Sequence, residues 1–305
     1  MEELAEHEIS FLEGLAFTGL HNDVVEFDQN LLNEAFERFA PPLLSDITLP
    51  RLSFLRTSGL SSEISNQSCH FLHLTYQEYF AARYFVRQWK ASLPNTWLPA
   101  SGDTQDAGPT PIEYLRKHKY IARYDILWRF LAGLLDADGK AKEFFDVIGK
   151  EPVDLLGLTH QRLVIHCLSE VQALPQSSFT PVRTRLEDDL VEWLLFECKC
   201  RNESSLAREM ELPPLVLCRA MQSATDDGRG KFVKALTKRH SVPTCVADLL
   251  ASWLEPHAPR ELIRRILAIL GRHSFLSDEL LTRVAAGLND SDWRIRREAV
   301  QALTS

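Results

Sequence analysis

The stretch that decides the fold is Cys69-His70-Phe71-Leu72-His73-Leu74-Thr75-Tyr76-Gln77-Glu78-Tyr79-Phe80-Ala81-Ala82-Arg83-Tyr84-Phe85, because its pattern changes period in the middle. Residues 69–74 are short, apolar and aromatic, which predicts a β-strand. From Thr75 onward the apolar residues recur at helical spacing. Glu78 follows Thr75 by three positions, which predicts a Thr-x-x-Glu capping box. The expected local structure is a strand that leads directly into a capped helix.

This joint resembles a family signature. Residues 71–82 resemble the sequence Phe-x-His-x-[Ser/Thr]-[Phe/Tyr]-Gln-Glu-[Phe/Tyr]-Phe-Ala-Ala of NACHT proteins. These are NLR-like signalling ATPases of the STAND class. In them the segment closes the winged-helix domain and begins the helical arm that follows. Residues 12–20 also resemble the first helix of that winged-helix domain.

The elements expected before the joint have the order of a winged helix. A helix is predicted over 5–20, and a short strand over 24–27. Asp28 is the expected N-cap of a second helix, which Pro41 and Pro42 end. A third helix is expected over 49–55 and a turn-rich wing over 59–67. We therefore expect residues 1–90 to form a winged-helix domain of the NACHT type.

The chain after the joint is expected to be helical. Residues 91–111 are rich in turn formers and predict a flexible surface loop. Residues 112–200 are expected to form a helical arm and 201–305 a HEAT-like α-solenoid. The predicted helices are 112–117, 120–135, 142–149, 160–174, 178–196, 203–210, 213–224, 229–238, 243–254, 260–271, 277–288 and 292–303. The expected fold class is mainly α: a winged helix, a helical arm and an α-solenoid.

The last predicted helix pair resembles a HEAT repeat. Its turn carries Asp290 and Asp292, and Ile295-Arg296 stands where the repeat usually has Val-Arg. Earlier pairs match this pattern poorly. No polar capping repeat follows this pair, and an exposed solenoid end is unfavourable. We infer that the natural array continues beyond Ser305 or that the chain is a fragment.

Composition excludes several classes of protein. The chain has 305 residues, 45% of them hydrophobic and 25% charged, and its net charge is −8. This is a globular composition. The acidic balance argues against a nucleic-acid or anionic-membrane partner, and no apolar run is long enough to cross a membrane. The six cysteines are scattered along the chain and are expected to be free thiols in the cytoplasm.

His73 is the one candidate site residue. In NACHT proteins the histidine at this position of the motif reaches the phosphates of ADP in the closed state, so the resemblance implies that His73 senses the nucleotide state. An imidazole N–H can donate to a phosphate. The structural alternative is a histidine that only packs on a small sheet. No catalytic residue and no metal-ligand set is predicted.

A phosphate-binding loop is missing from the sequence. The nearest approach, residues 133–141, has the wrong spacing, and Ala141 replaces the required hydroxyl. The two glycines there are better explained as a helix end and a turn. We expect no enzyme activity and no cofactor in this chain. ADP or ATP is expected only with a nucleotide-binding domain that lies upstream or is supplied in trans.

Two functions remain open, besides DNA binding by the winged helix. The first is the regulatory and scaffold part of a NACHT-type signalling protein, with protein partners and a role in innate-immunity or cell-death signalling of the fungal kind. The second is a HEAT-repeat adaptor that does not depend on nucleotide. DNA binding would use Arg51 and Arg56 and would require a steep salt dependence. Basic runs near 231–239, 264–265 and 294–297 are expected to be solvated helix faces or a groove for an acidic partner.

Overall fold

In the computed structural model the chain is mainly helical and divides into two compact units. The structure describes residues 2–39, 54–58, 68–98, 108–155, 157–172, 178–255, 257–272 and 277–304. Unit 1 comprises residues 1–163 and 170–179, and unit 2 comprises residues 164–169 and 180–305. In the described part of the chain, no helix combines the length and apolar character that a membrane span requires.

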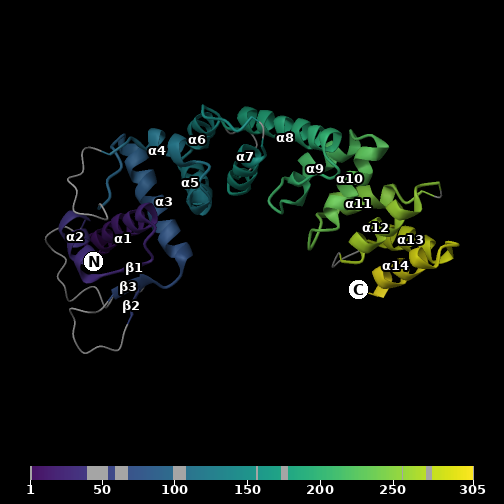
Figure 1. Ribbon diagram of the computed structural model, residues 1–305, viewed down its shortest axis with the longest axis horizontal. Helices are drawn as coiled ribbons and strands as arrows, with labels where there is room; N and C mark the ends of the chain where they lie inside the picture. The colour runs from purple at the N-terminus through teal and green to yellow at the C-terminus, as the bar shows by residue number, and fades with distance from the viewer. Residues whose placement is uncertain are drawn as a thin grey trace. The chain divides into compact units, whose positions relative to one another are not determined.

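Unit 1 combines helices with a small antiparallel sheet (Figure 1). Its helical elements are α1 (Glu2–Asn22), α2 (Gln29–Phe39), α3 (Leu74–Ala91), α4 (Pro111–His118), η3 (Ala122–Tyr124), α5 (Asp125–Ala137) and α6 (Ala141–Ile148). The strands are β1 (Glu26–Phe27), β2 (Leu55–Ser58) and β3 (Ser68–Phe71). β3 lies in the middle and pairs antiparallel with both neighbours, so that Cys69 faces Phe27 on one side and Thr57 on the other.

The core of unit 1 is aromatic. α1 packs along α3, where Phe17 stacks on Tyr84 with ring centroids 4.9 Å apart. α3 in turn packs on α5, and Phe85 meets the fully buried Trp128 edge to face. A buried carboxylate, Glu13, receives Arg83 at 3.0 Å and Arg87 at 3.1 Å. Because these pairs join α1 to α3, the register of α3 is fixed along its whole length.

The segment after α3 is held at both ends. The Tyr84 hydroxyl lies 2.8 Å from the Thr96 hydroxyl and also accepts the Thr96 backbone N–H. The Asn95 N–H donates to the Pro109 carbonyl at 3.0 Å. Thr110 and Glu113 then form a capping box that begins α4. The predicted loop 91–111 is irregular over 92–98 and 108–110, and its remaining residues, 99–107, lie outside the described part.

The strand region corrects two predictions. The predicted strand 69–74 is β3, which ends at Phe71. The predicted third helix, 49–55, is wrong at its end, because Phe54 lies in a turn and Leu55 begins β2. Leu55 is buried opposite Phe71, and burial of this apolar side chain on the sheet outweighs local helix propensity. Residues 49–53 and the predicted wing 59–67 lie outside the described residues.

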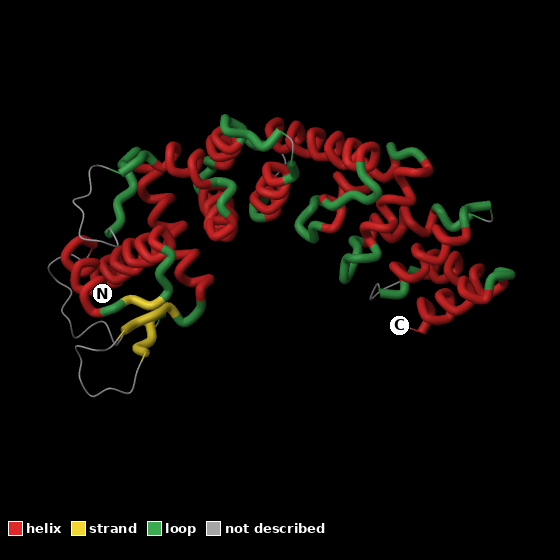
Figure 2. The backbone as a smooth tube through the Cα atoms, viewed as in Figure 1, coloured by secondary structure: helices red, strands yellow, loops and turns green. Residues whose placement is uncertain are grey.

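Unit 2 consists of helices in two rows. They are α8 (Thr180–Cys200), η4 (Leu206–Arg208), α9 (Pro214–Gln222), α10 (Asp226–Leu236), α11 (Thr244–Ser252), α12 (Arg260–Leu270), α13 (Asp278–Ala286), η5 (Gly287–Asn289) and α14 (Trp293–Thr304). α9, α11 and α13 pack in succession, and so do α10, α12 and α14. α7 (Thr159–Ser169) is shared, because residues 159–163 belong to unit 1 and residues 164–169 to unit 2. Figure 2 shows strands only in unit 1 among the described residues.

The predicted helix 203–210 is only the short turn η4. Glu197, at the end of α8, accepts the backbone N–H groups of Ser205 and Leu206 and the hydroxyls of Ser204 and Ser205. A carboxylate that satisfies two successive N–H groups begins a turn there. The chain is therefore bent tightly instead of continuing as a full helix.

The last helix pair shows why its turn carries aspartates. Asp290 accepts the N–H of Asp292 at 2.7 Å, and Asp292 accepts the N–H of Arg294 at 2.9 Å. Arg296 donates back to the carbonyls of Asp290 and Ser291. Ile295 points into the core and is almost fully buried.

Candidate functional site

The candidate site lies where β3 passes into α3. His73 is the N-cap of α3, and its backbone is extended, with φ −149° and ψ 145°. Its ring Nδ1 accepts the backbone N–H of Thr75 at 3.1 Å. An imidazole nitrogen that accepts a hydrogen bond carries no proton, so a neutral ring must carry its proton on Nε2. His73 is exposed, and in the described part of the chain its Nε2 has no hydrogen-bond partner.

The predicted capping box at Thr75 is wrong. α3 begins at Leu74, one residue earlier than predicted, and the imidazole of His73 replaces the threonine hydroxyl as the cap. Glu78 does not reach back to the helix start, because it is buried on α3 and lies near Asp125 on α5. The hydrogen-bonding role predicted for Thr75 therefore belongs to the candidate functional residue itself.

Four exposed apolar or aromatic side chains lie close to His73 in sequence or just before the strand paired with that segment. Phe54, Leu72, Leu74 and Tyr76, here called the collar, are each between 37% and 47% exposed. The Phe54 and Tyr76 rings meet edge to face, with centroids 5.3 Å apart, and the Leu72 N–H donates to the Phe54 carbonyl. Exposed apolar patches with a polar group inside them are typical of protein interaction surfaces. The collar was not predicted from the sequence, because the apolar residues around His73 do not show by themselves which side chains are buried and which are exposed.

Glu78 lies behind this surface and is only 8% exposed. Burial raises the pKa of its carboxyl group to about 6, and the charge of Asp125 adds to the effect. Near neutral pH the carboxylate is therefore an unfavourable charge between α3 and α5.

The residues that resemble a phosphate-binding loop do not form one. Gly133 lies inside α5, and Gly139 lies in the turn after α5 with φ +70°. The Gly139 N–H donates to the Asp136 carbonyl at 2.8 Å, which closes the turn. The predicted turn is confirmed at Gly139, whereas the prediction that Gly133 ends a helix is wrong, because α5 continues to Ala137.

Unit 2 contains a basic groove between α10, α12 and α14, with a volume of about 550 Å³. Its lining includes Lys234, Lys238, Arg264, Arg265 and Arg272, but only one carboxylate, Glu298. Gly271 and Ala302 meet at its floor, where a Cβ on Gly271 would lie 3.0 Å from the Ala302 Cα. Two of the predicted basic runs therefore converge on one groove, whereas Arg294 and Arg297 pack against the exposed Trp293 ring.

The arginines of this groove already bind one carboxylate. Glu261, just outside the groove, receives Arg264 through both oxygens at 2.9 Å and Arg265 at 2.7 Å. The hydrogen bond from Arg264 holds the pKa of Glu261 at about 2. Lys238 is likewise paired with Glu203 at 2.9 Å, whereas Arg272 donates to the carbonyls of Ala268 and Thr237.

The described cysteines are free thiols, as predicted. Cys198 is buried and Cys200 is exposed, so the Cys-x-Cys spacing does not bring two ligands to one site. Cys218 and Cys245 do meet, with their Sγ atoms 3.4 Å apart. Burial raises the pKa of the Cys218 thiol to about 12, which keeps it protonated and unreactive near neutral pH.

Comparisons with known proteins do not identify the chain. No protein-family model, curated protein or solved structure matches it.

Proposed function

We propose that the chain is the regulatory and scaffold part of a NACHT-type STAND signalling protein. The observation that carries the proposal is the exposed His73 at the start of α3, with its Nε2 proton available and an apolar collar around it. In this proposal the collar docks on a nucleotide-binding domain, supplied in cis or in trans. His73 then donates to the phosphates of bound ADP.

The physical chemistry of the joint suits a phosphate. The start of a helix carries a partial positive charge and favours anions. α3 has 18 residues, so its dipole is fully developed. Because Nδ1 is committed to the Thr75 N–H, the ring is held in one orientation and one neutral tautomer. The donor needs little reorganisation on binding.

The rest of the chain supports the same proposal. The antiparallel pairing of β2 with β3 favours a winged helix over a purely helical cap. The two helix rows of unit 2 and the aspartate turn before α14 support a HEAT-like solenoid. In the proposed mechanism the helical repeats hold a closed state or sense a ligand in the cytoplasm. Ligand binding then shifts the population toward an open state that oligomerises.

The test is the rate of ADP release from a protein that contains this chain together with its nucleotide-binding domain. His73→Leu should accelerate release roughly tenfold or more, because a hydrogen bond to a charged group contributes about 1.5–3 kcal/mol. Removing the N-cap should also cost about 1 kcal/mol of stability.

A second variant separates these two effects. His73→Asp keeps an N-cap acceptor, since aspartate is a preferred N-cap, but places a negative charge against the phosphates. It should leave the free energy of unfolding nearly unchanged and still accelerate ADP release. If His73→Asp retained ADP as the parent protein does, the nucleotide-sensing role of His73 would be wrong.

The alternative function is a HEAT-repeat adaptor that binds an acidic protein without nucleotide dependence. The basic groove between α10, α12 and α14 favours it. The two functions differ in one measurable respect. An adaptor binds its partner equally with ADP, with ATP and without nucleotide, whereas the proposed switch changes its affinity between these states.

A further inference from the structure

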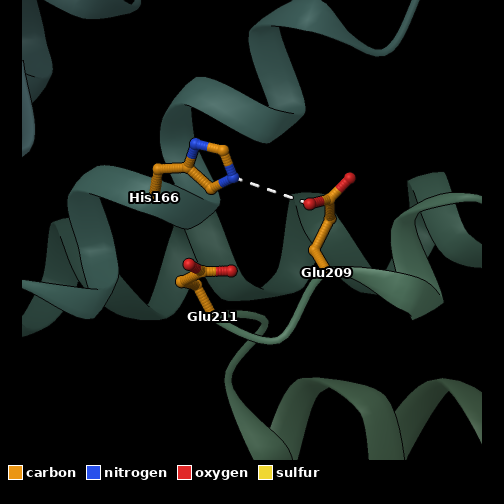
Figure 3. A group of neighbouring side chains, drawn as sticks. All are labelled: His166, Glu209 and Glu211. Atoms are coloured by element: carbon orange, nitrogen blue, oxygen red, sulfur yellow. Dashed lines mark ion pairs between the residues drawn. The ribbon is translucent and has the colours of Figure 1, made fainter. Parts of the chain in front are cut away.

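A histidine and two glutamates converge inside unit 2 (Figure 3). His166 lies on the part of α7 that belongs to unit 2, and Glu209 and Glu211 lie between η4 and α9. The His166 Nε2 is 3.6 Å from a Glu209 oxygen. One ligand atom from each residue can be chosen so that all three lie within 4.8 Å of one another. All three residues are half-buried.

We propose that this cluster binds a divalent transition metal ion, with Zn²⁺ as the best fit. One imidazole nitrogen and two carboxylate oxygens are a donor set suited to zinc and its neighbours. Calcium and magnesium prefer oxygen atoms alone, so the histidine selects against them. Three protein ligands also leave a coordination position for water, as in open zinc sites.

The distances are close to those of a metal site. Zinc bonds of about 2.0–2.2 Å to nitrogen and oxygen place neighbouring ligand atoms roughly 3.3 Å apart in a tetrahedron. The separation between His166 and Glu209 is already 3.6 Å. A carboxylate oxygen of Glu211 lies within 4.8 Å of a ligand atom of each of the other two residues. In Figure 3 the Glu209 side chain lies to the right of the His166 ring and the Glu211 side chain below it.

The competing explanation is an ion cluster around Arg239. This side chain is 3% exposed, and one of its N–H groups donates to the Glu209 carbonyl. Burial lowers the pKa of Arg239, and the charges of Glu209 and Glu211 oppose that effect. The Arg239 hydrogen bond goes to the backbone carbonyl of Glu209 and not to a carboxylate oxygen, so it does not use a ligand atom of the cluster.

A bound ion would join α7 to the segment that enters α9. Metal binding that occurs only in the folded state adds to stability by mass action, so unit 2 should unfold at a temperature several degrees higher with excess metal. The ion also competes with a proton for the His166 ring. Affinity should therefore fall as the pH drops toward 5. None of this depends on nucleotide or on the proposed role of His73.

The experiment is calorimetric titration of the tag-free, chelator-treated chain with Zn²⁺. One ion per chain is expected at micromolar affinity or tighter. Glu209→Gln and Glu211→Gln preserve shape and should each weaken binding at least tenfold, as should His166→Ala. The matched control changes a neighbouring histidine and glutamate outside the cluster, His257→Ala with Glu255→Gln, and should bind as the parent does.

Several outcomes would overturn the proposal. These are no binding by the parent chain, affinity unchanged in both glutamine variants, or equal affinity for Mg²⁺ or Ca²⁺. The glutamine variants are also melted without metal, and their melts should overlay that of the parent. Loss of the zinc-induced rise in melting temperature in these variants, with retention of the rise in the control, supports the site independently of calorimetry.

Discussion

At the scale of single residues, Glu78 fits a capping-box pattern in the sequence but has a different role in the structure. It stands where a capping box needs a glutamate, yet only 8% of it is exposed, on the side of α3 that faces α5. Its raised pKa means that ionisation opposes folding. The pKa is about 6 in the folded chain against 4.5 for an ordinary glutamate.

Glu78→Gln should therefore stabilise the protein above pH 6. Between pH 4.5 and 6 the folded state binds more protons than the unfolded state, so the free energy of unfolding falls as pH rises through this window. We expect the variant to exceed the parent by on the order of 1 kcal/mol at pH 7.5 and to match it at pH 4. Urea unfolding at both pH values measures this. Glu34→Gln, at an exposed site on α2, should show no such pH-dependent gain.

The same residues explain what the sequence could predict about the site. His73 was found because a motif of fixed spacing surrounds it. Its role as N-cap was not predicted, because Thr75 and Glu78 have the spacing of a capping box in the sequence. Only the packing of α3 on α5 decides that Glu78 is buried. The exposure of the collar was not predicted for a related reason. Leu72 and Leu74 are apolar, and from the sequence alone they are expected to be buried.

At the scale of elements, the end of α12 packs against α14 at a glycine, Gly271. A Cβ on Gly271 would lie 3.0 Å from the Ala302 Cα and 3.3 Å from its Cβ. Two backbones that meet this closely cannot yield as a flexible side chain would. Gly230, inside α10, has no atom within 4 Å of such a Cβ.

These two glycines form a matched pair. Gly271→Ala should lower the free energy of unfolding by about 1–3 kcal/mol, because it forces the two helices apart. Gly230→Ala should raise it by about 0.4–1 kcal/mol, because alanine restricts the unfolded chain without strain in the helix. Urea unfolding of both variants, followed by circular dichroism, gives the comparison. Equal effects of the two substitutions would contradict the close packing of α12 on α14.

Helix positions in unit 2 were well predicted for a physical reason. Apolar residues recur at three and four along 243–254 and 260–271, and a helix with one buried face needs no other information. η4 was mispredicted because the carboxylate that bends the chain, Glu197, lies on the preceding helix. β2 was mispredicted because its partner, β3, is distant in sequence. Local periodicity does not include either interaction.

At the scale of the whole molecule, charge is unevenly distributed. The chain has a net charge of −8, yet the lining of the groove between α10, α12 and α14 carries five cations and one carboxylate. Arg264 and Arg265 pair with Glu261, and Lys238 pairs with Glu203, so Lys234 and Arg272 are the two cations of the lining whose role in binding an acidic ligand we test. Lys234 and Arg272, which are far apart in sequence, both contribute, so no single basic run predicts the groove.

An acidic peptide should therefore bind the groove in a salt-dependent manner. We expect a glutamate-rich peptide of about 15 residues to bind the parent chain at 50 mM salt and to bind much more weakly at 300 mM, because screening shortens the range of exposed charges. Lys234→Glu with Arg272→Glu should abolish binding. Lys150→Glu with Lys199→Glu makes the same charge change at exposed sites elsewhere and should bind as the parent does. Fluorescence anisotropy of the labelled peptide measures binding by the parent chain at both salt concentrations and by the two double variants.

The hydrogen bond from Asn95 to Pro109 has a practical consequence for engineering. The Asn95 nitrogen lies 3.0 Å from the Pro109 carbonyl oxygen, so the segment 96–108 starts and ends close together, between α3 and α4. Lengthening a chain whose ends already meet adds only about 0.6 kcal/mol for each doubling of its length. A folded reporter domain whose own termini are adjacent could therefore be inserted at residues 103–104 without separating α3 from α4. Such a chimera would carry its label within unit 1, between α3 and α4.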